Sequence, residues 1–372
     1  MYVLSILAWD TGPAGGEGTL RRPWRRVSRR TATRGHGNLS SVSHAPERSP
    51  LLTLASMDGD RERIEAAMFD AVQTPDPYLT EIASHLVVAG GKRLRPVVAI
   101  AAAQIGGSPA TDDVVRGGVA CELVHLGSLY HDDVIDESDT RRGVETVNAK
   151  WGNLQAILAG DFLLSKASEI AASLGTEVAG LLARTIGWLC QGEVEQLRFT
   201  YNTTRTEQSY LSSINGKTAT LYGTAARIGA IVAGLDRKLV DTLTEWGNAF
   251  GMVFQIVDDI LDVTTTSERL GKPAGHDMVE GVYTLPVLRT LAMDHGVGAE
   301  LRSLLGKPLE SAERDKALAI VRANEGVESA ATTARRYVAE AEQACDSLPS
   351  GPATDALRAA PAALLESALT PA

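Results

Sequence analysis

Two short acidic clusters are the residues of this chain most able to do chemistry. They are His131–Asp136 (HDDVID) and Gln255–Asp262 (QIVDDILD), and each contains the pattern D-D-x-x-D. On a helix, residues four apart lie on one face about one turn apart. The first and last aspartate of each cluster should therefore point two carboxylates in the same direction.

Such carboxylate pairs repel each other unless a cation compensates them. Hard divalent cations prefer carboxylate oxygens, and magnesium commonly bridges one or two carboxylates to the phosphates of a substrate. A pair of solvated helix ends is the alternative interpretation of a single cluster. Two copies, each preceded by an apolar helical stretch (Cys121–Tyr130 and Phe250–Val257), favour the metal site.

Basic residues flank the two clusters in sequence order. Gly90–Pro96 (GGKRLRP) is a Gly-Gly turn followed by three cations, of which Lys92 and Arg95 are spaced to converge on one anion. The phosphate-binding pattern G-x-x-x-x-G-K-[ST] is absent. A solvated surface cation is the ordinary interpretation of any one of them, so the argument for phosphate binding rests on the whole set. The other members of this set are Arg141, Arg142, Lys217 and Lys272.

The elements that position these residues are predicted to be helices. From residue 57 onward, apolar residues recur at helical spacing, and strand alternation is not sustained anywhere. The pattern predicts an all-α bundle that forms one domain over residues 57–372. Residues 1–56 are predicted to be a disordered, Arg-rich extension. A tail for anionic surfaces, an organelle leader and a functionless upstream segment before Met57 are its three interpretations.

Charge and cysteine content limit the function further. The net charge of the 372 residues is −10; residues 1–56 carry eight Arg and three acids (+5), so the remainder carries −15. A body this acidic argues against nucleic-acid binding, and it needs bridging cations to bind anionic substrates. The three cysteines form no CxxC pair, which favours a reducing, cytoplasmic location. No apolar run reaches the ~18 residues of a membrane span.

Six segments together resemble the trans-type polyprenyl diphosphate synthases, the family of farnesyl, geranylgeranyl and longer-chain synthases. The resemblance implies an all-α isoprenoid-synthase bundle with a central cavity, usually as a homodimer. It also implies head-to-tail condensation of isopentenyl diphosphate onto an allylic diphosphate. The segments are GGKRLRP (90–96), HDDVIDESDTRRG (131–143), GDFLLSKA (160–167), GKTATL (216–221), FQIVDDILD (254–262) and GKPAGHD (271–277).

The resemblance also implies roles for individual residues. Two or three magnesium ions, bridged by substrate diphosphate, would be held by the two acidic clusters. Thr218 and Gln255 would line the reacting carbons, although Thr218 could instead bond its own helix backbone. The implied metal ligands or their supports are Asp132, Asp133, Asp136, Asp258, Asp259 and Asp262.

Two diphosphate sites follow from the same motifs. Arg141, Lys217 and Lys272 would clamp the allylic diphosphate. His125 belongs to the other site by resemblance, with a buried core histidine as the alternative. The residues implied for isopentenyl diphosphate are Lys92, Arg95, His125 and Arg142.

Two departures and three alternatives qualify the resemblance. Val282 stands where many members have Lys, and the C-terminus lacks the basic end that some members use. A class I terpene cyclase would share the first cluster but would have no use for Lys92 and Arg95. A non-catalytic partner subunit usually lacks some aspartates of the two acidic clusters, and this chain keeps all six of them. A short-chain farnesyl or geranylgeranyl synthase is the third alternative.

Product length is expected to depend on the helix that leads to Asp132. A helix rises about 5.4 Å per turn, roughly the span of one isoprene unit. Ser128 and Gly127, four and five residues before Asp132, are small, and Val124 deeper on the same face is not large. Short-chain members tend to have aromatic residues there. We therefore expect a product of about six to ten isoprene units, the length typical of quinone side chains.

The variant Ser128→Phe tests this expectation. A phenyl ring one turn before Asp132 should block the growing chain, so the product should shorten by at least one isoprene unit of about 5.4 Å. Chromatography of the dephosphorylated products measures the change. An unchanged chain length would contradict the assignment of this helix face as the ruler.

Overall fold

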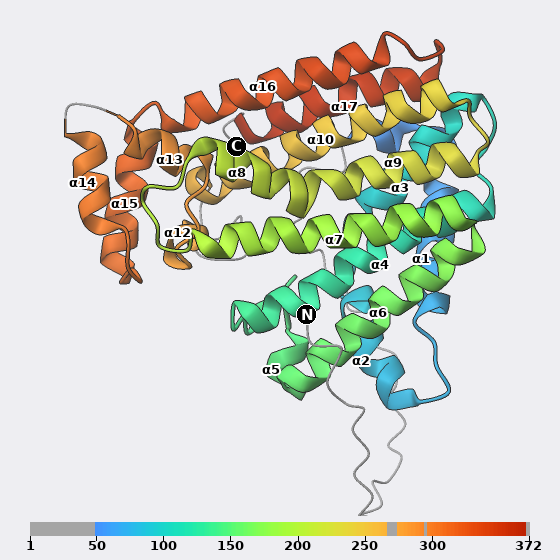
Figure 1. The fold of residues 1–372 in the computed structure, drawn as a ribbon, viewed down its shortest axis with the longest axis horizontal. Helices are drawn as coiled ribbons and strands as arrows, with labels where there is room; N and C mark the ends of the chain where they lie inside the picture. The colour runs from blue at the N-terminus through green and yellow to red at the C-terminus, as the bar shows by residue number, and fades with distance from the viewer. Residues whose placement is uncertain (1–48, 266–273, 294–295, 370–372) are drawn as a thin grey trace, which may run out of the picture. The chain divides into compact units, whose positions relative to one another are not determined.

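The computed structural model describes residues 49–265, 274–293 and 296–369, and the structural statements below refer to these ranges. Long helices dominate (Figure 1), so the prediction of an all-α fold is confirmed. No described helix has both the length and the apolar character that crossing a membrane requires. The elements are η2 (Pro50–Thr53), α1 (Met57–Ala71), α2 (Pro77–Val88), α3 (Leu94–Ala103), η3 (Gln104–Gly106), α4 (Asp112–Ile135), β1 (Thr140–Arg141), β2 (Val144–Glu145), α5 (Val147–Trp151), α6 (Asn153–Ser173), α7 (Thr176–Arg198), α8 (Glu207–Ile214), η4 (Asn215–Ala219), α9 (Thr220–Val232), α10 (Arg237–Thr264), α12 (His276–Val279), α13 (Leu285–Leu291), α14 (Val297–Leu304), α15 (Ser311–Ala323), α16 (Gly326–Cys345) and α17 (Pro352–Leu369).

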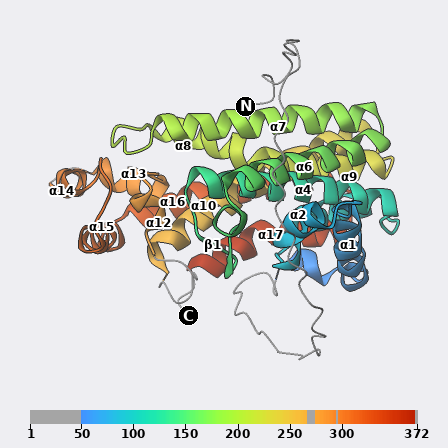
Figure 2. The ribbon, with the colours of Figure 1, turned by 90° about the horizontal axis from the view of Figure 1, so that it is seen from below.

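The helices α4 and α10, which carry the two acidic clusters, are both central to the bundle. Helix α4 packs against α3, α6 and α9, while α10 packs against α9, α16 and α17. Helix α9 therefore lies against both of them. In Figure 1, α16 and α17 run side by side along α10, and Figure 2 gives the perpendicular view. Both acidic clusters end long, largely buried helices, so packing along the whole helix fixes their position.

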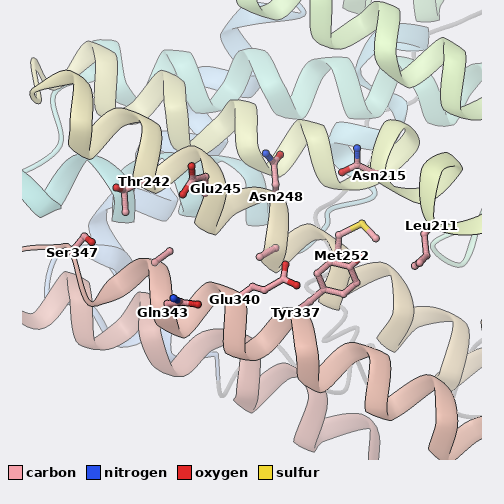
Figure 3. A pocket seen from close by; sticks show the side chains of 12 residues that line it. Leu211, Asn215, Thr242, Glu245, Asn248, Met252, Tyr337, Glu340, Gln343 and Ser347 are labelled. Carbon is pink, nitrogen blue, oxygen red and sulfur yellow. The ribbon is translucent and has the colours of Figure 1, made fainter. Parts of the chain in front are cut away.

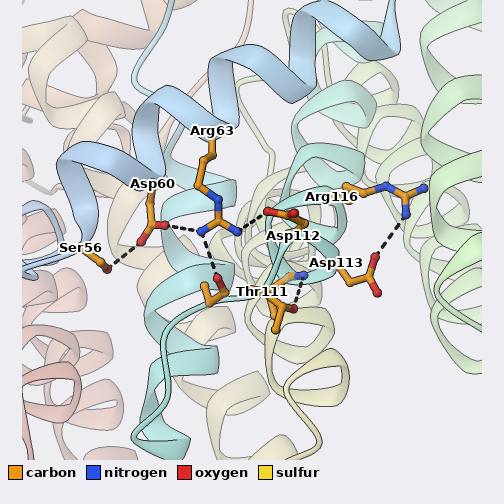
Figure 4. A network of polar contacts seen from close by, with 9 residues as sticks. Ser56, Asp60, Arg63, Thr111, Asp112, Asp113 and Arg116 are labelled. Atoms are coloured by element: carbon orange, nitrogen blue, oxygen red, sulfur yellow. Dashed lines mark hydrogen bonds and ion pairs between the residues drawn. The ribbon is translucent and has the colours of Figure 1, made fainter.

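Polar contacts hold the start of α4 (Figure 4). Thr111 is the N-cap, and its hydroxyl oxygen accepts a hydrogen bond from the amide of Val114 at 3.3 Å. Arg63 on α1 donates to the carboxylates of Asp60 at 2.6 Å and Asp112 at 2.7 Å. Acidic residues in the first turn also favour the helix dipole. Thr111 therefore caps α4, and the helix is anchored at the end opposite to the first acidic cluster.

The folded part of the chain begins earlier than the sequence predicted. Pro50–Thr53 forms a 3₁₀ turn, and Leu51 and Leu54 are buried in the main hydrophobic cluster, where η2 contacts α3 and α17. The predicted disordered extension was therefore wrong for residues 50–56, because two leucines among polar neighbours are enough to dock this turn. Residues 1–48 lie outside the described ranges.

A β-hairpin follows α4. Thr140 pairs with Glu145 and Arg141 pairs with Val144 in antiparallel register. The two-residue turn between them has positive φ at both positions, 54° at Arg142 and 75° at Gly143, as tight hairpin turns require. The hairpin matters because it carries both arginines of the D-T-R-R-G segment back towards α4.

Close backbone contacts between α3 and α9 depend on glycine. A Cβ atom built on Gly229 would lie only 2.0 Å from the carbonyl O of Ala99. We expect Gly229→Ala to lower the free energy of unfolding by about 3 kcal/mol or more, because two backbones must separate. Denaturant unfolding measures this value. Gly59→Ala on α1 is the control, since no atom lies within 4 Å of its added Cβ. Equal stability of both variants would contradict the packing described here.

Candidate active site

The first acidic cluster lies at the C-terminal end of α4. The amide of Asp136, the C-cap, donates to the carbonyl O of Asp132 at 2.8 Å, so the helical turn continues through both residues. Asp132 is half-buried and Asp136 is exposed. Asp133 is buried instead, and its carboxylate accepts a hydrogen bond from Arg141 Nε at 2.6 Å. The hydrogen bond between Asp133 and Arg141 therefore links the hairpin to α4. Asp132 and Asp136, four residues apart, lie together on a different face of the helix.

A π turn brings Lys217 to this cluster. The turn, η4, connects α8 to α9, and such turns inside helices often mark functional sites. Lys217 Nζ lies 2.5 Å from Glu193 Oε2 on α7. A Cβ atom on Gly192 would lie 2.5 Å from the backbone N of Lys217, so only glycine permits this approach. Sequence reasoning missed Glu193 and Gly192, although a glycine next to an acid inside a predicted helix was a usable signal.

Negative charge is in excess around Lys217. Burial raises the pKa of Asp132, and the charge of Glu193 adds to the rise while Lys217 opposes it. Partial desolvation raises the pKa of Asp136 to about 6, and Glu280 adds to that rise. Three carboxylates, those of Asp132, Glu193 and Asp136, therefore act on one ammonium group. A region of this kind attracts a further cation.

The second cluster, on α10, distributes its aspartates differently. Asp258 is exposed, and its charge opposes the lowering of the pKa of Lys92 that burial causes. Asp262 is buried, and its carboxylate accepts a hydrogen bond from the amide of Asp277 at 3.4 Å. Asp259 is also buried. Lys92, on the loop before α3, therefore lies close enough to Asp258 for their charges to interact.

Asp259 belongs to a chain of hydrogen bonds. The hydroxyl of Tyr210 on α8 donates to Asp259 Oδ2 at 2.5 Å, and Gln255 Nε2 donates to Asp259 Oδ1 at 2.8 Å. The hydroxyl of Thr218 donates to Gln255 Oε1 at 2.8 Å. The structure thus brings Thr218 and Gln255 together, as the sequence analysis expected of two residues at one site. Nothing in the sequence pattern identified Tyr210.

Arginines surround a neutral histidine on the inner side of α4. Desolvation lowers the pKa of His125 well below its usual value, and the charges of Arg95, Arg142, Arg141 and Arg93 lower it further, in that order. An uncharged imidazole among guanidinium groups leaves this region strongly positive. It is the type of environment that binds a compact anion such as diphosphate.

The arginines of this region are held in different ways. Arg95 is buried, lies 4.8 Å from the ring centre of Tyr222, and leaves its Nε without a hydrogen-bond partner. Arg142 donates to the carbonyl O of Gly90. Arg93, by contrast, pairs with Glu65 at 2.8 Å and has a structural role. Within the described residues, Arg95 and Arg142 therefore form no ion pair with a carboxylate, unlike Arg93 and Arg141.

The donors fit magnesium. Carboxylate oxygens are its preferred protein ligands, and the excess of negative charge at Asp132 and Asp136 favours a divalent cation. Within the described ranges, no three His, Cys, Asp or Glu side chains are grouped closely enough to hold a metal ion. Since magnesium readily keeps water and phosphate ligands, the site fits an ion that binds together with a phosphate-bearing substrate.

The residues expected to set product length occupy the buried part of α4. Val124 is buried, and the hydroxyl of half-buried Ser128 donates to the carbonyl O of His125 at 2.8 Å. A Cβ atom on Gly127 would lie 3.2 Å from the side chain of Leu164 on α6. Gly127 therefore faces α6, and Leu164 is the neighbour that sequence reasoning did not name.

Lys272 and Val282 are the two remaining positions that the sequence analysis singled out. Lys272 is outside the described residues. At the position where family members often have Lys, the amide of Val282 donates to the carbonyl O of Asp277 at 2.8 Å.

A cavity of about 660 Å³ (Figure 3) lies between α10 and α16, and none of the predicted site residues lines it. It borders the site only through Asn215, the first residue of η4.

The raised pKa of Asp136 predicts a pH-dependent stability. With a folded-state pKa of about 6 against a usual 3.8, the folded protein holds this proton more tightly than the unfolded chain. The free energy of unfolding should therefore fall as pH rises from about 4 to about 6. Without metal, Asp136→Asn should gain about 2 °C in Tm over the wild type between pH 4.5 and pH 7.

Thermal unfolding at the two pH values measures this difference. Asp70→Asn, on the exposed side of α1, is the matched carboxylate control. A gain for Asp136→Asn that is the same at both pH values would contradict the charge excess described above.

Comparisons with known proteins identify the family of this chain. The sequence profile described as "Polyprenyl synthetase" matches residues 76–321. Nonaprenyl diphosphate synthase of Mycobacterium tuberculosis is 39% identical over 298 residues, covering 80% of this chain and 89% of that protein. Heptaprenyl diphosphate synthase component 2 of Geobacillus stearothermophilus is 39% identical over 303 residues, 81% and 94% of the two chains.

A solved structure shows the same fold. Polyprenyl synthase from Caulobacter crescentus, complexed with calcium and isoprenyl diphosphate, matches with a TM-score of 0.79 and 32% identity, covering 86% of this chain and 96% of that one. The chain therefore belongs to the polyprenyl synthetase family, and it is an enzyme of the polyprenyl diphosphate synthase kind.

Proposed function

We propose that this protein is a magnesium-dependent prenyltransferase that adds isopentenyl diphosphate head-to-tail, in trans, to an allylic diphosphate. The product is a polyprenyl diphosphate longer than C20, of the kind used for quinone side chains. The observation that carries the proposal is the combination of two carboxylate clusters, at the ends of α4 and α10, with a group of arginines around His125. Two diphosphate groups need two such positive environments, one made by metal and one made by arginine.

In this proposal, magnesium would be held by Asp132, Asp136 and Asp258. Asp133, Asp259 and Asp262 support these ligands from their buried positions. When bound, the metal neutralises the charge that grows on a departing diphosphate. Lys217 has the same task, because its ammonium group already lies among the carboxylates of the first cluster. Arg141 and Lys272 complete this allylic subsite by family resemblance.

The second diphosphate belongs to the pocket on the inner side of α4. Lys92, Arg95, His125 and Arg142 hold isopentenyl diphosphate there. Neutral His125 donates a hydrogen bond without adding charge, while the guanidinium groups supply the attraction. Arg95 is buried and its Nε has no partner within the described protein, so a donor is available to a bound oxyanion.

The reaction needs an environment for an allylic cation. Breaking the allylic C–O bond leaves a carbocation, which Gln255 Oε1 and the Thr218 hydroxyl stabilise through their lone pairs while water is excluded. The double bond of isopentenyl diphosphate attacks this cation, forming the new C–C bond. The proton then lost passes to the departing diphosphate, so no side-chain base is required.

The chain length is inferred from the small residues on α4. Gly127, Ser128 and Val124 present no aromatic floor next to the first cluster. The relatives named nonaprenyl and heptaprenyl diphosphate synthase support a product in the same range. A short-chain synthase remains the alternative that product analysis decides.

We further propose a cytoplasmic homodimer. The exposed apolar residues of α6 and α7 suit a second copy of the chain, and the three cysteines are free thiols. A non-catalytic role as one subunit of a heteromeric synthase is the alternative, in view of the relative named as a component. The exposed apolar residues are Leu154, Ile157, Leu158, Trp188, Val194 and Leu197.

The catalytic domain in this proposal comprises residues 57–372, and the Arg-rich extension before it has no part in the reaction.

The direct test incubates the purified full chain with magnesium, labelled isopentenyl diphosphate and farnesyl diphosphate. Chromatography of the dephosphorylated products should show linear prenyl alcohols longer than C20. Asp132→Ala should lower kcat by about 10²–10³-fold, because a ligand for the leaving-group cation is lost. Asp113→Ala, at the opposite end of α4, is the control and should keep full activity.

Other outcomes would change the proposal in definite ways. A cyclic hydrocarbon would refute it in favour of a cyclase. Products that stop at C20 would show a short-chain synthase. Activity that appears only after a second subunit is added would show a partner subunit.

A further inference from the structure

The two neighbouring aspartates Asp258 and Asp259 have opposite environments. Asp258 is exposed at the surface of α10, whereas the Asp259 side chain is buried and only 2% of the residue is accessible. Both carboxylate oxygens of Asp259 already accept hydrogen bonds, Oδ2 from the hydroxyl of Tyr210 at 2.5 Å and Oδ1 from Gln255 Nε2 at 2.8 Å. A carboxylate held in this way is used within the protein rather than presented to a metal.

The orientation of the Gln255 amide depends on this carboxylate. An amide has a donor end and an acceptor end, and a carboxylate accepts only from the donor end. Asp259 therefore holds Nε2 on its own side and leaves Oε1 on the side of Thr218, whose hydroxyl donates to it at 2.8 Å. If the amide were reversed, two acceptor oxygens would face each other at Asp259.

Arg205 and Ser213 hold Tyr210 in place. The guanidinium carbon of Arg205 lies 5.7 Å from the centre of the Tyr210 ring, and Arg205 donates a hydrogen bond to the hydroxyl of Ser213. The hydroxyl of Ser213 donates to the carbonyl O of Tyr210 at 2.9 Å. The ring is almost completely buried. The phenol hydroxyl therefore has a fixed position from which to hold Asp259.

We propose that Asp259 and Tyr210 are positioning residues that act through Gln255, fixing its carbonyl oxygen towards the reacting carbons, and that Asp259 is not a magnesium ligand. The inference rests on the proposed prenyl transfer and refines the role of the second cluster. Asp258 is then the metal ligand of its pair. The hydrogen-bonded chain also joins α10 to η4, so the amide that faces the cation and the turn that carries Lys217 are set by one network.

A double-mutant cycle tests this role. Asp259→Asn can accept or donate towards Gln255, so it no longer selects one amide orientation, and kcat should fall about tenfold. In the Gln255→Ala background the same substitution should cost less than about twofold, because the group through which it acts is gone. The magnesium concentration for half-maximal activity should change less than about twofold, in contrast to Asp258→Asn.

A binding measurement gives a readout independent of turnover. Calorimetry with magnesium and an unreactive farnesyl thiolodiphosphate should give nearly wild-type affinity for Asp259→Asn and at least about tenfold weaker affinity for Asp258→Asn. Tyr210→Phe should repeat the loss of kcat with unchanged metal dependence. Tyr283→Phe is the matched control, because that buried tyrosine contacts the amide of Gly306 instead.

Each result separates the inference from the proposed function. An inactive wild type would overturn the prenyl transfer itself. An active wild type with additive losses in the cycle, or weaker magnesium-dependent binding for Asp259→Asn, would overturn the positioning role. If Asp259→Asn does not fold, the cycle between Tyr210→Phe and Gln255→Ala carries the same test, and wild-type kcat in Tyr210→Phe would contradict the inference.

Discussion

The concentration of carboxylates at the ends of α4 and α10 is the constraint on which the site depends. Asp132, Glu193 and Asp136 all act on Lys217 with negative charge, and Glu280 adds to the negative charge at Asp136. Folding must hold these groups together although they repel one another, and it does so with helices that are anchored along their buried length. The repulsion between these carboxylates makes sense in an enzyme that works with cations and phosphates. The metal ions that bind with the substrate supply the positive charge that the protein alone lacks.

Backbone contacts made possible by glycine give the site its geometry. Gly192 lets η4 reach α7, which places Lys217 beside Glu193, and Gly229 lets α9 reach α3. Gly91 fits under the guanidinium group of Arg142, where a Cβ atom would lie 2.8 Å from Nη1. The contacts at Gly192 and Gly91 each bring a charged side chain to a partner on another element. The positions of the cations therefore depend on residues that carry no charge.

Helical periodicity was enough to predict the all-α fold, and motif order singled out residues of which the structure brings several together. Asp132, Lys217 and Gln255 were identified because local patterns surround them. Tyr210 and Glu193 were not, since each acts through a partner far away in the sequence, at Asp259 and Lys217. Spacing also could not show that Asp133 and Asp259 turn inward, because burial is decided by packing.

The environment of each residue was likewise beyond local reasoning. Burial lowers the pKa of His125, and four arginines on α3, the loop before it and the hairpin lower it further; only the tertiary structure brings these groups together. Leu51 and Leu54 looked like part of a polar extension, yet they are buried against the bundle. In both cases contacts between residues far apart in the sequence decided the environment of the side chain, and the composition of the surrounding segment did not.

The most direct test of the account is a crystal structure of the full chain with magnesium and an unreactive allylic thiolodiphosphate. The account predicts metal ions on Asp132, Asp136 and Asp258, bridged by the diphosphate, with Asp259 still bonded to Tyr210 and Gln255. Metal ions bound to Asp259, or a diphosphate that binds away from both acidic clusters, would contradict it.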